Sequence, residues 1–327
     1  MHRLKIAVLD DYLNSVRSLR CFQMIKDHDV TVWPDHVQEE SELARRLAAA
    51  EVLVLIRERT KIDAGLISSL PNLRLISLKG AYPHVDVDAC TRRGILVSSD
   101  MLPSGPSFAT AELTWALILS AMRRLPQQMA SLREGRWQDS IGHSLHGKTL
   151  GIYGYGRLGQ VVAGYGRAFG MKVAVFGRAN ALAAARADGF VAAASKAELF
   201  ESADVLSLHL RLVAETRGIV SYAELARMSP TSVFVNTSRA GLVEPGALEA
   251  ALRSGRPGMA AVDVYDREPL LDRGDSLLLM PNVFCTPHIG YVTSEEFEGQ
   301  FSAIFGQILA YADGKPINIA NPDVLKT

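Results

Sequence analysis

Three residues, Arg239, Glu268 and His288, have the types and the order of a proton-transfer site. Each lies at or just after the end of a predicted strand, and they follow one another at intervals of 29 and 20 residues. A histidine exchanges a proton near neutral pH, and a neighbouring carboxylate stabilises its charged form. The planar donor fork of an arginine can hold a carboxylate and polarise a carbonyl beside it. Together the three residues suit chemistry at a carbonyl on which negative charge develops.

Each of these residues also has a purely structural explanation. Arg239 would cap a strand end, Glu268 would be a solvated loop acid, and His288 would be a core histidine bonded to backbone. The catalytic interpretation therefore depends on the three occurring together, downstream of a nucleotide-binding loop.

Such a loop is predicted by Gly154, Gly156 and Gly159, which form a G-x-G-x-x-G pattern. A β-prone run precedes the glycines, and a helical segment and the apolar run Lys172–Phe176 follow them. This strand–turn–helix–strand context is typical of a dinucleotide site, where the glycines permit a tight turn, close approach of a pyrophosphate and close packing. The free N–H groups at the start of the helix then hold the phosphates. A glycine-rich turn without a ligand is the alternative.

The end of the second strand bears on which dinucleotide is bound. An acidic residue there would bond the ribose hydroxyls of NAD, whereas an arginine can accept the extra phosphate of NADP. Gly177 and Arg178 occupy these positions, so no carboxylate is present to repel a phosphate. This favours NADP, with NAD and a solvated Arg178 as the alternative.

The composition indicates an ordinary globular protein of two domains. The 327 residues are 48% hydrophobic and 21% charged, and Lys+Arg and Asp+Glu balance at 35 each. This balance argues against nucleic acid or a membrane surface as a partner. Three cysteines form no C-x-x-C pair and fit a reducing, cytoplasmic compartment, and we expect no metal.

Alternating strands and helices predict two α/β domains with parallel sheets. A Pro/Gly/Ser break over residues 101–107 marks a boundary and a hinge, with a second hinge near 290–295. We therefore expect a discontinuous substrate domain, residues 1–102 and 291–327, with a dinucleotide-binding domain, residues 103–290, inserted into it. Predicted strands are Lys5–Leu9, Val30–Trp33, Val52–Ile56, Leu73–Leu78, Ile95–Ser98, Thr149–Tyr153, Lys172–Phe176, Val205–Leu208, Val233–Asn236, Met259–Val264 and Val283–Thr286.

With its glycine loop and its Arg239, Glu268-Pro and Pro-His288 segments, nearly the whole chain resembles the D-isomer-specific 2-hydroxyacid dehydrogenases. This family includes phosphoglycerate dehydrogenases and glyoxylate/hydroxypyruvate reductases. The resemblance implies a Rossmann-type cofactor domain inserted into a flavodoxin-like substrate domain. It also implies that His288 is the acid/base, that Glu268 is its carboxylate partner, and that Arg239 binds and polarises the substrate.

The resemblance extends to residues near the cofactor. Asp263 resembles an aspartate beside the nicotinamide carboxamide, and Thr237 a residue whose backbone contacts the same group. Thr216 matches a position near the cofactor, although a helix N-cap explains it nearly as well. The remaining matches are backbone positions: Arg157 and Leu158 at the pyrophosphate, and His209 at the nicotinamide pocket.

The substrate side matches the family less closely. Gly80 and Ala81 keep the start of a loop whose N–H groups hold the substrate carboxylate, but Pro83 removes one donor. Arg57 follows the third strand, where it would meet an anionic substrate tail. A surface charge run partly neutralised by Glu58 is the alternative.

The resemblance predicts hydride transfer between NAD(P)H and a 2-oxo/D-2-hydroxy acid pair, with phosphoglycerate and glyoxylate/hydroxypyruvate as the candidate substrates. A homodimer is also expected, with Ala109–Arg136 as the interface and Trp115 and Trp137 beside it, unless these tryptophans fill the core of their own protomer. The alternative from another class is a dinucleotide-sensing binding protein, similar to the corepressors that share this fold. A second alternative is another dehydrogenase with an inserted cofactor domain, such as alanine dehydrogenase or an adenosylhomocysteinase-like enzyme, and the arrangement of the three residues argues against both.

Overall fold

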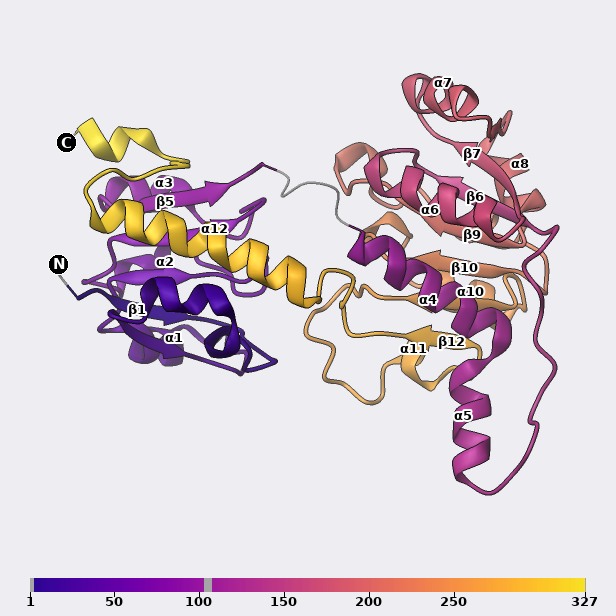
Figure 1. Ribbon diagram of the computed structural model, residues 1–327, viewed down its shortest axis with the longest axis horizontal. Coiled ribbons are helices and arrows are strands. Elements are labelled where there is room, and N and C mark those ends of the chain that lie inside the picture. The colour runs from indigo at the N-terminus through magenta and orange to yellow at the C-terminus, as the bar shows by residue number, and fades with distance from the viewer. Residues whose placement is uncertain (1–2, 103–107, 327) are drawn as a thin grey trace. The chain divides into compact units, whose positions relative to one another are not determined.

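A computed structural model describes residues 3–102 and 108–326 (Figure 1). The chain forms two compact units: Met1–Gly105 with Thr293–Thr327, which we call unit 1, and Pro106–Val292, which we call unit 2. The second unit is thus inserted into the first, and its limits differ by two or three residues from those expected. Most of the predicted hinge at 101–107 lies outside the described residues.

Unit 1 is built around a parallel sheet of five strands within the described residues, in the order β2-β1-β3-β4-β5. This is the flavodoxin-like order. The central strand β3 is apolar along its whole length and every residue of it is buried, as expected of a parallel strand covered on both faces. The strands are β1 Lys5–Val8, β2 Asp29–Val32, β3 Val52–Val54, β4 Leu75–Lys79 and β5 Leu96–Asp100; the α-helices are α1 Glu40–Leu47, α2 Ala64–Ser68, α3 Val87–Arg92 and α12 Ser294–Ala312.

The C-terminal helix α12 packs onto the sheet formed by the N-terminal residues (Figure 1, yellow). Its buried Gln307 donates from Nε2 to Ser77 Oγ at 2.8 Å and to the Leu78 carbonyl at 3.1 Å. This satisfies a polar side chain inside an apolar layer. Residues of the C-terminal segment thus lie against the sheet that the N-terminal residues form.

Unit 2 contains a parallel sheet of seven strands in its described part, in the order β12-β11-β10-β9-β6-β7-β8. Six of these strands were predicted; the seventh, β8, consists of only two residues. The strands are β6 Thr149–Tyr153, β7 Lys172–Phe176, β8 Val191–Ala192, β9 Val205–Leu208, β10 Val233–Asn236, β11 Met259–Val262 and β12 Val283–Cys285. The helices are α4 Ala109–Arg123, α5 Leu125–Arg133, α6 Arg157–Ala168, α7 Ala179–Ala187, α8 Lys196–Ser202, α9 Tyr222–Leu225, α10 Ala247–Arg253 and α11 Ser276–Leu279.

The strand order of unit 2 reverses at β6, which pairs with β7 on one side and β9 on the other. Ligands of such folds usually bind outside the carboxyl ends of the strands at the point where the strand order reverses. Two doubly wound domains, one of them of the Rossmann type, are thus confirmed.

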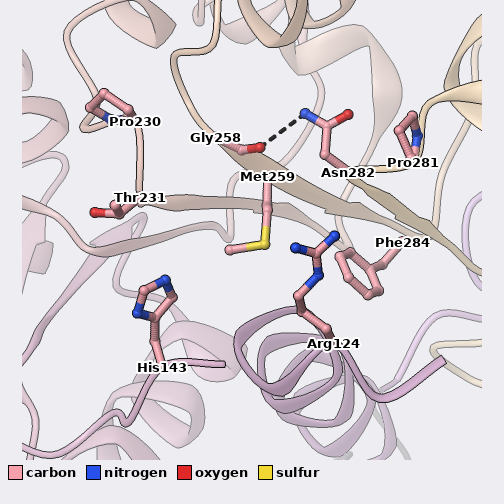
Figure 2. A pocket seen from close by; sticks show the side chains of 9 residues that line it. All are labelled: Arg124, His143, Pro230, Thr231, Gly258, Met259, Pro281, Asn282 and Phe284. Atoms are coloured by element: carbon pink, nitrogen blue, oxygen red, sulfur yellow. Dashed lines mark hydrogen bonds between the residues drawn. The ribbon is translucent and has the colours of Figure 1, made fainter. Parts of the chain in front are cut away.

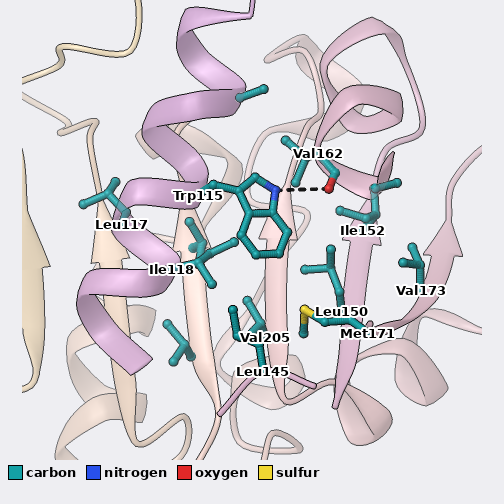
Figure 3. Close-up of a cluster of buried hydrophobic side chains, with 14 of the residues drawn as sticks. Trp115, Leu117, Ile118, Leu145, Leu150, Ile152, Val162, Met171, Val173 and Val205 are labelled. Carbon is teal, nitrogen blue, oxygen red and sulfur yellow. Dashed lines mark hydrogen bonds between the residues drawn. The ribbon is translucent and has the colours of Figure 1, made fainter. Parts of the chain in front are cut away.

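Trp115 of α4 belongs to the core of unit 2 (Figure 3). It is 4% exposed, donates from Nε1 to the Val162 carbonyl at 3.1 Å and stacks on Phe169 with ring centroids 4.7 Å apart. Trp137, by contrast, is 77% exposed. The core explanation therefore holds for Trp115 and is wrong for Trp137. None of the helices in the described chain is long and apolar enough to cross a membrane.

Candidate active site

The glycine loop between β6 and α6 contains two positions that only glycine can occupy. Gly154 has φ +101°, and a Cβ there would lie 2.6 Å from the carbonyl oxygen of His209. A Cβ on Gly159 would lie 2.2 Å from the carbonyl oxygen of Gly154. Both separations are far below van der Waals contact, so the turn requires the two glycines for close packing of strand, helix and the end of β9.

Gly156 differs, because a Cβ at this residue would meet nothing within 4 Å. It is the N-cap of α6, and no side chain caps this helix end. The N–H groups of Arg157 and Leu158, in the first turn of α6, therefore have no partner within the helix. Open space above uncapped N–H groups at a helix N-terminus suits the pyrophosphate of a dinucleotide.

Gly177 and Arg178 follow β7 beside this loop. A Cβ on Gly177 would lie 3.9 Å from the Cα of Gly154 and 4.0 Å from the nitrogen of Tyr155, so this position borders the glycine turn. Arg178 is exposed and is the N-cap of α7. The end of β7 thus carries no carboxylate, as the sequence indicates.

His288 and Glu268 form a direct pair. The Nδ1 atom of His288 lies 2.5 Å from Glu268 Oε2, and Glu268 Oε1 accepts from the backbone N–H of Tyr265 at 2.9 Å. A carboxylate at Nδ1 fixes the proton on that nitrogen and leaves Nε2 for exchange. Burial alone would raise the pKa of Glu268, but the hydrogen bond and charge of His288 outweigh it and lower that pKa below its usual value.

Arg239 stands on a loop that is pinned after β10. Asn236 donates from Nδ2 to the Arg239 carbonyl at 2.9 Å, and Ser238 donates from Oγ to the Leu208 carbonyl at 2.7 Å. The Arg239 side chain is exposed, and its charge is one of the influences that lower the pKa of Glu268. The structure therefore brings the three predicted residues to the carboxyl edge of one sheet.

Asp263, fully buried after β11, ties down the loop that carries His288. Its Oδ1 accepts from Thr286 Oγ1 at 2.6 Å and from the Ile289 N–H at 2.8 Å, and its Oδ2 accepts from the Gly290 N–H at 2.9 Å. Burial raises the pKa of Asp263, although these three bonds oppose that rise. Thr286 was not singled out from the sequence, although it lies in the quoted Pro-His288 segment.

The other predicted cofactor residues are held within loops of unit 2. A hydrogen bond of 2.8 Å joins Thr237 Oγ1 to Thr114 Oγ1, and one of 2.9 Å joins His209 Nε2 to Ser207 Oγ. Burial lowers the pKa of His209 to about 4, so its imidazole is neutral.

Thr216 is the last residue of a 3₁₀ helix, Ala214–Thr216, whose N-cap is Val213. The N-cap explanation for Thr216 is therefore wrong. Its hydroxyl is used locally, because it donates to the Arg211 carbonyl at 2.5 Å.

Unit 1 holds the predicted substrate residues other than Arg239. Arg57 follows β3 with φ +60°, and Gly80 follows β4 with φ +93° and donates to the Asp100 carbonyl at 3.0 Å. Ala81 is exposed beside Gly80. These positions lie at the carboxyl ends of neighbouring strands of the sheet of unit 1.

The residues after Arg57 are not a solvated charge run. Arg59 donates from Nη1 to the Asp10 carbonyl at 2.5 Å, and the buried Thr60 donates to Asp10 Oδ2 at 2.6 Å. Asp10 also pairs with His36 Nδ1 at 2.9 Å. Sequence reasoning missed Asp10, whose partners His36 and Thr60 are distant in the chain.

Residues 115–290 match the model of the D-isomer specific 2-hydroxyacid dehydrogenase NAD binding domain. The chain belongs to the D-isomer-specific 2-hydroxyacid dehydrogenases. A glyoxylate reductase of Thermococcus litoralis is 33% identical over 312 residues, which cover 92% of each chain. A D-3-phosphoglycerate dehydrogenase of Bacillus subtilis is 34% identical over 267 residues, which cover 81% of this chain and 50% of that protein.

A crystal structure from Ralstonia solanacearum, provisionally described as a D-3-phosphoglycerate dehydrogenase oxidoreductase, is 51% identical with a TM-score of 0.94 and covers 98% of both chains. Membership in the family makes the protein an oxidoreductase that transfers hydride between a nicotinamide cofactor and a 2-oxo/2-hydroxy acid pair.

We expect Gly159→Ala to raise the dissociation constant of the dinucleotide by about tenfold or more, since the turn must open to admit a methyl group against the Gly154 carbonyl. Cofactor binding followed by calorimetry would measure this. Gly164→Ala is the matched control, because it lies on the same helix and its added Cβ meets nothing within 4 Å. Equal affinity of the two variants would contradict the packing argument.

Proposed function

We propose that the enzyme reduces a small 2-oxo acid of the glyoxylate or hydroxypyruvate type to its D-2-hydroxy acid, with NADPH as the preferred reductant. The contact of 2.5 Å between His288 Nδ1 and Glu268 Oε2 carries the proposal, because it forms a proton donor at the carboxyl edge of the cofactor sheet.

The reduced cofactor supplies a hydride to the carbonyl carbon, and the protein residues manage the charge that develops on the oxygen. Glu268 stabilises the protonated imidazole through Nδ1, so that the Nε2–H of His288 can give its proton to this oxygen. Arg239 binds the substrate carboxylate and polarises the carbonyl through its donor fork. The backbone of Gly80 and Ala81 and the guanidinium of Arg57 are proposed to bind the anionic ends of the substrate.

The same proposal assigns cofactor contacts around the glycine loop. Gly154, Gly156 and Gly159 shape the cradle, and the N–H groups of Arg157 and Leu158 bind the pyrophosphate. Thr216, His209, Thr237 and Asp263 border the nicotinamide end, the last through the loop that it holds.

The test is the initial rate of NADPH and NADH oxidation with glyoxylate, hydroxypyruvate, 3-phosphohydroxypyruvate and pyruvate. We expect His288→Gln to lower kcat by about 100-fold or more, because general acid catalysis contributes factors of this size. Cofactor affinity should stay unchanged, since no cofactor contact is removed. Tight cofactor binding without turnover on any of the four acids would instead support the sensing alternative.

Glu268→Gln is the companion variant for the same measurement. It keeps the shape of the side chain but removes the carboxylate that accepts from Nδ1 of His288 and orients the ring, so kcat for reduction should fall by about tenfold or more while cofactor affinity stays unchanged. A kcat equal to that of the wild type would show that the carboxylate only packs in the loop.

The end of β7 supports the preference for NADPH. Gly177 and Arg178 stand there, and neither carries a carboxylate that would repel the ribose phosphate of this cofactor. We expect Gly177→Asp to shift the ratio of kcat/KM from NADPH toward NADH by about tenfold or more, since the carboxylate accepts from the ribose hydroxyls and repels the phosphate. Gly177→Asn, similar in size but neutral, should shift the ratio far less. A wild-type enzyme that already prefers NADH would contradict the assignment.

A homodimer is proposed from an apolar surface on α5 and the segment after it, which extend away from the sheet of unit 2 (Figure 1). Leu125, Met129 and Leu132 lie at helical spacing on α5, and Trp137 and Ile141 follow; all five are between 41% and 93% exposed. Exposed large apolar side chains in such a group mark an interaction surface, here for a second copy of the chain.

Light scattering should give the mass of two chains for the wild type. The double substitution Met129→Glu with Leu132→Glu should yield single chains, because two charges would be buried without partners. Val191→Glu, on the exposed strand β8, is the control and should remain dimeric. A single-chain mass for the wild type would overturn the dimer.

A further inference from the structure

A cavity of about 230 Å³ lies at the amino ends of β10, β11 and β12 in unit 2 (Figure 2). Its walls come from the residues that precede or begin these strands and from the junction of α4 with α5. The lining residues are Arg124, His143, Pro230, Thr231, Gly258, Met259, Pro281, Asn282 and Phe284. Arg239, Asp263 and His288 follow the opposite, carboxyl ends of the same strands, so this cavity is distinct from the active site.

The cavity is electropositive. Arg124 is a permanent cation, and none of the nine described lining residues is Asp or Glu. The Nε atom of Arg124 is buried and has no hydrogen-bond partner within the described chain. A buried guanidinium N–H without an acceptor costs about 1–3 kcal/mol, so the position calls for an acceptor that the protein does not supply.

Arg124 is also held in a strained backbone conformation. It has φ +50° and ψ +42°, between the end of α4 and the start of α5. The left-handed region costs a residue with a Cβ about 1–2 kcal/mol, and glycine or asparagine usually occupies such a position. An arginine does not stabilise such a turn better than glycine or asparagine would. The role of this residue therefore lies in what its side chain does in the cavity.

The opposite wall is fixed by close contacts of the segment that returns from α5. A Cβ on Gly142 would lie 2.8 Å from the Met122 carbonyl oxygen, so only glycine lets the segment approach the end of α4. The next residue, His143, donates its N–H to that same carbonyl at 2.7 Å. These contacts place the imidazole of His143 and the guanidinium of Arg124 around one space (Figure 2).

We propose that this cavity is a second ligand site, which binds a small oxyanion, either a phosphate or an organic carboxylate. Arg124 supplies the charged donors, His143 lines another part of the cavity, and Met259, Phe284 and the two prolines provide apolar walls for a short carbon chain. The volume is below that of typical sites for larger organic ligands, which excludes a nucleotide. The proposal does not rest on the hydride-transfer chemistry, because none of its residues belongs to the active site.

Met259 provides a local reporter for the test. The chain has nine methionines, and labelling their methyl groups with ¹³C leaves eight signals as internal controls once Met259→Leu has identified the ninth. Inorganic phosphate and succinate, titrated separately into the full-length protein with saturating cofactor, should each move the Met259 signal in a saturable way. A response to only one of them would identify which oxyanion the site binds.

Arg124→Asn removes the cation but tolerates the left-handed backbone, and should weaken the binding by about tenfold or more, since charge-assisted hydrogen bonds are lost. Arg123→Gln, an exposed neighbour with the same loss of charge, should leave the binding unchanged. His143→Gln, at an exposed side chain, should weaken it to a smaller extent and serves if Arg124→Asn does not fold. A Met259 signal that does not move, or that moves equally in Arg124→Asn, would overturn the proposal.

Discussion

The buried carboxylate of Asp263 is the interaction on which the active-site geometry depends. It lies after β11 and accepts three hydrogen bonds from the loop after β12, which carries His288. A buried carboxylate without partners is very unfavourable, so these hydrogen bonds strongly stabilise the one conformation of the loop that provides them. His288 itself has φ +52°, a conformation that costs a residue with a Cβ about 1–2 kcal/mol, and the bonds to Asp263 oppose that strain.

The same dependence on short contacts holds on the cofactor side. Gly154 packs against the carbonyl of His209, and Gly159 packs against the carbonyl of Gly154, so the end of β9, the turn and α6 form one closely packed group. A side chain at either glycine would separate them, and the N–H groups of α6 would no longer converge. The space at Gly156 stays open because Gly154 and Gly159 on either side are tightly packed. Affinity for the cofactor therefore depends on the packing of the fold around this turn.

Much of this arrangement could be predicted from the sequence, because it is encoded in local patterns. The glycine loop lies between a strand and a helix, and the predicted ends of β10, β11 and β12 place Arg239, Glu268 and His288 at one edge of a parallel sheet. Those signals need only chain order and strand direction.

What could not be predicted depends on contacts between distant residues or on very short elements. β8 has two residues, too few for any periodic pattern. Trp115 and Trp137 look alike in sequence, yet only the first meets a carbonyl and a ring partner from α6 and the residue after it. The use of both carboxylate oxygens of Asp263 by the loop after β12 could not be predicted for the same reason. The left-handed backbone of Arg124 could not be predicted either, because an arginine, unlike a glycine or an asparagine, gives no local signal for this conformation.

The two ends of β10, β11 and β12 show how one sheet can serve two kinds of site. At the carboxyl ends, loops diverge and place side chains from separate strands around a reacting group. At the amino ends, the chain enters the strands from tight connections, such as Gly258, where a Cβ would lie 1.8 Å from the Pro230 carbonyl oxygen. Such tight connections cannot extend into long loops that carry charged side chains. The charged group of a cavity at this edge must therefore come from another part of the chain. Arg124, between α4 and α5, supplies the cation, and His143, in the segment that returns from α5, lies across the cavity from it.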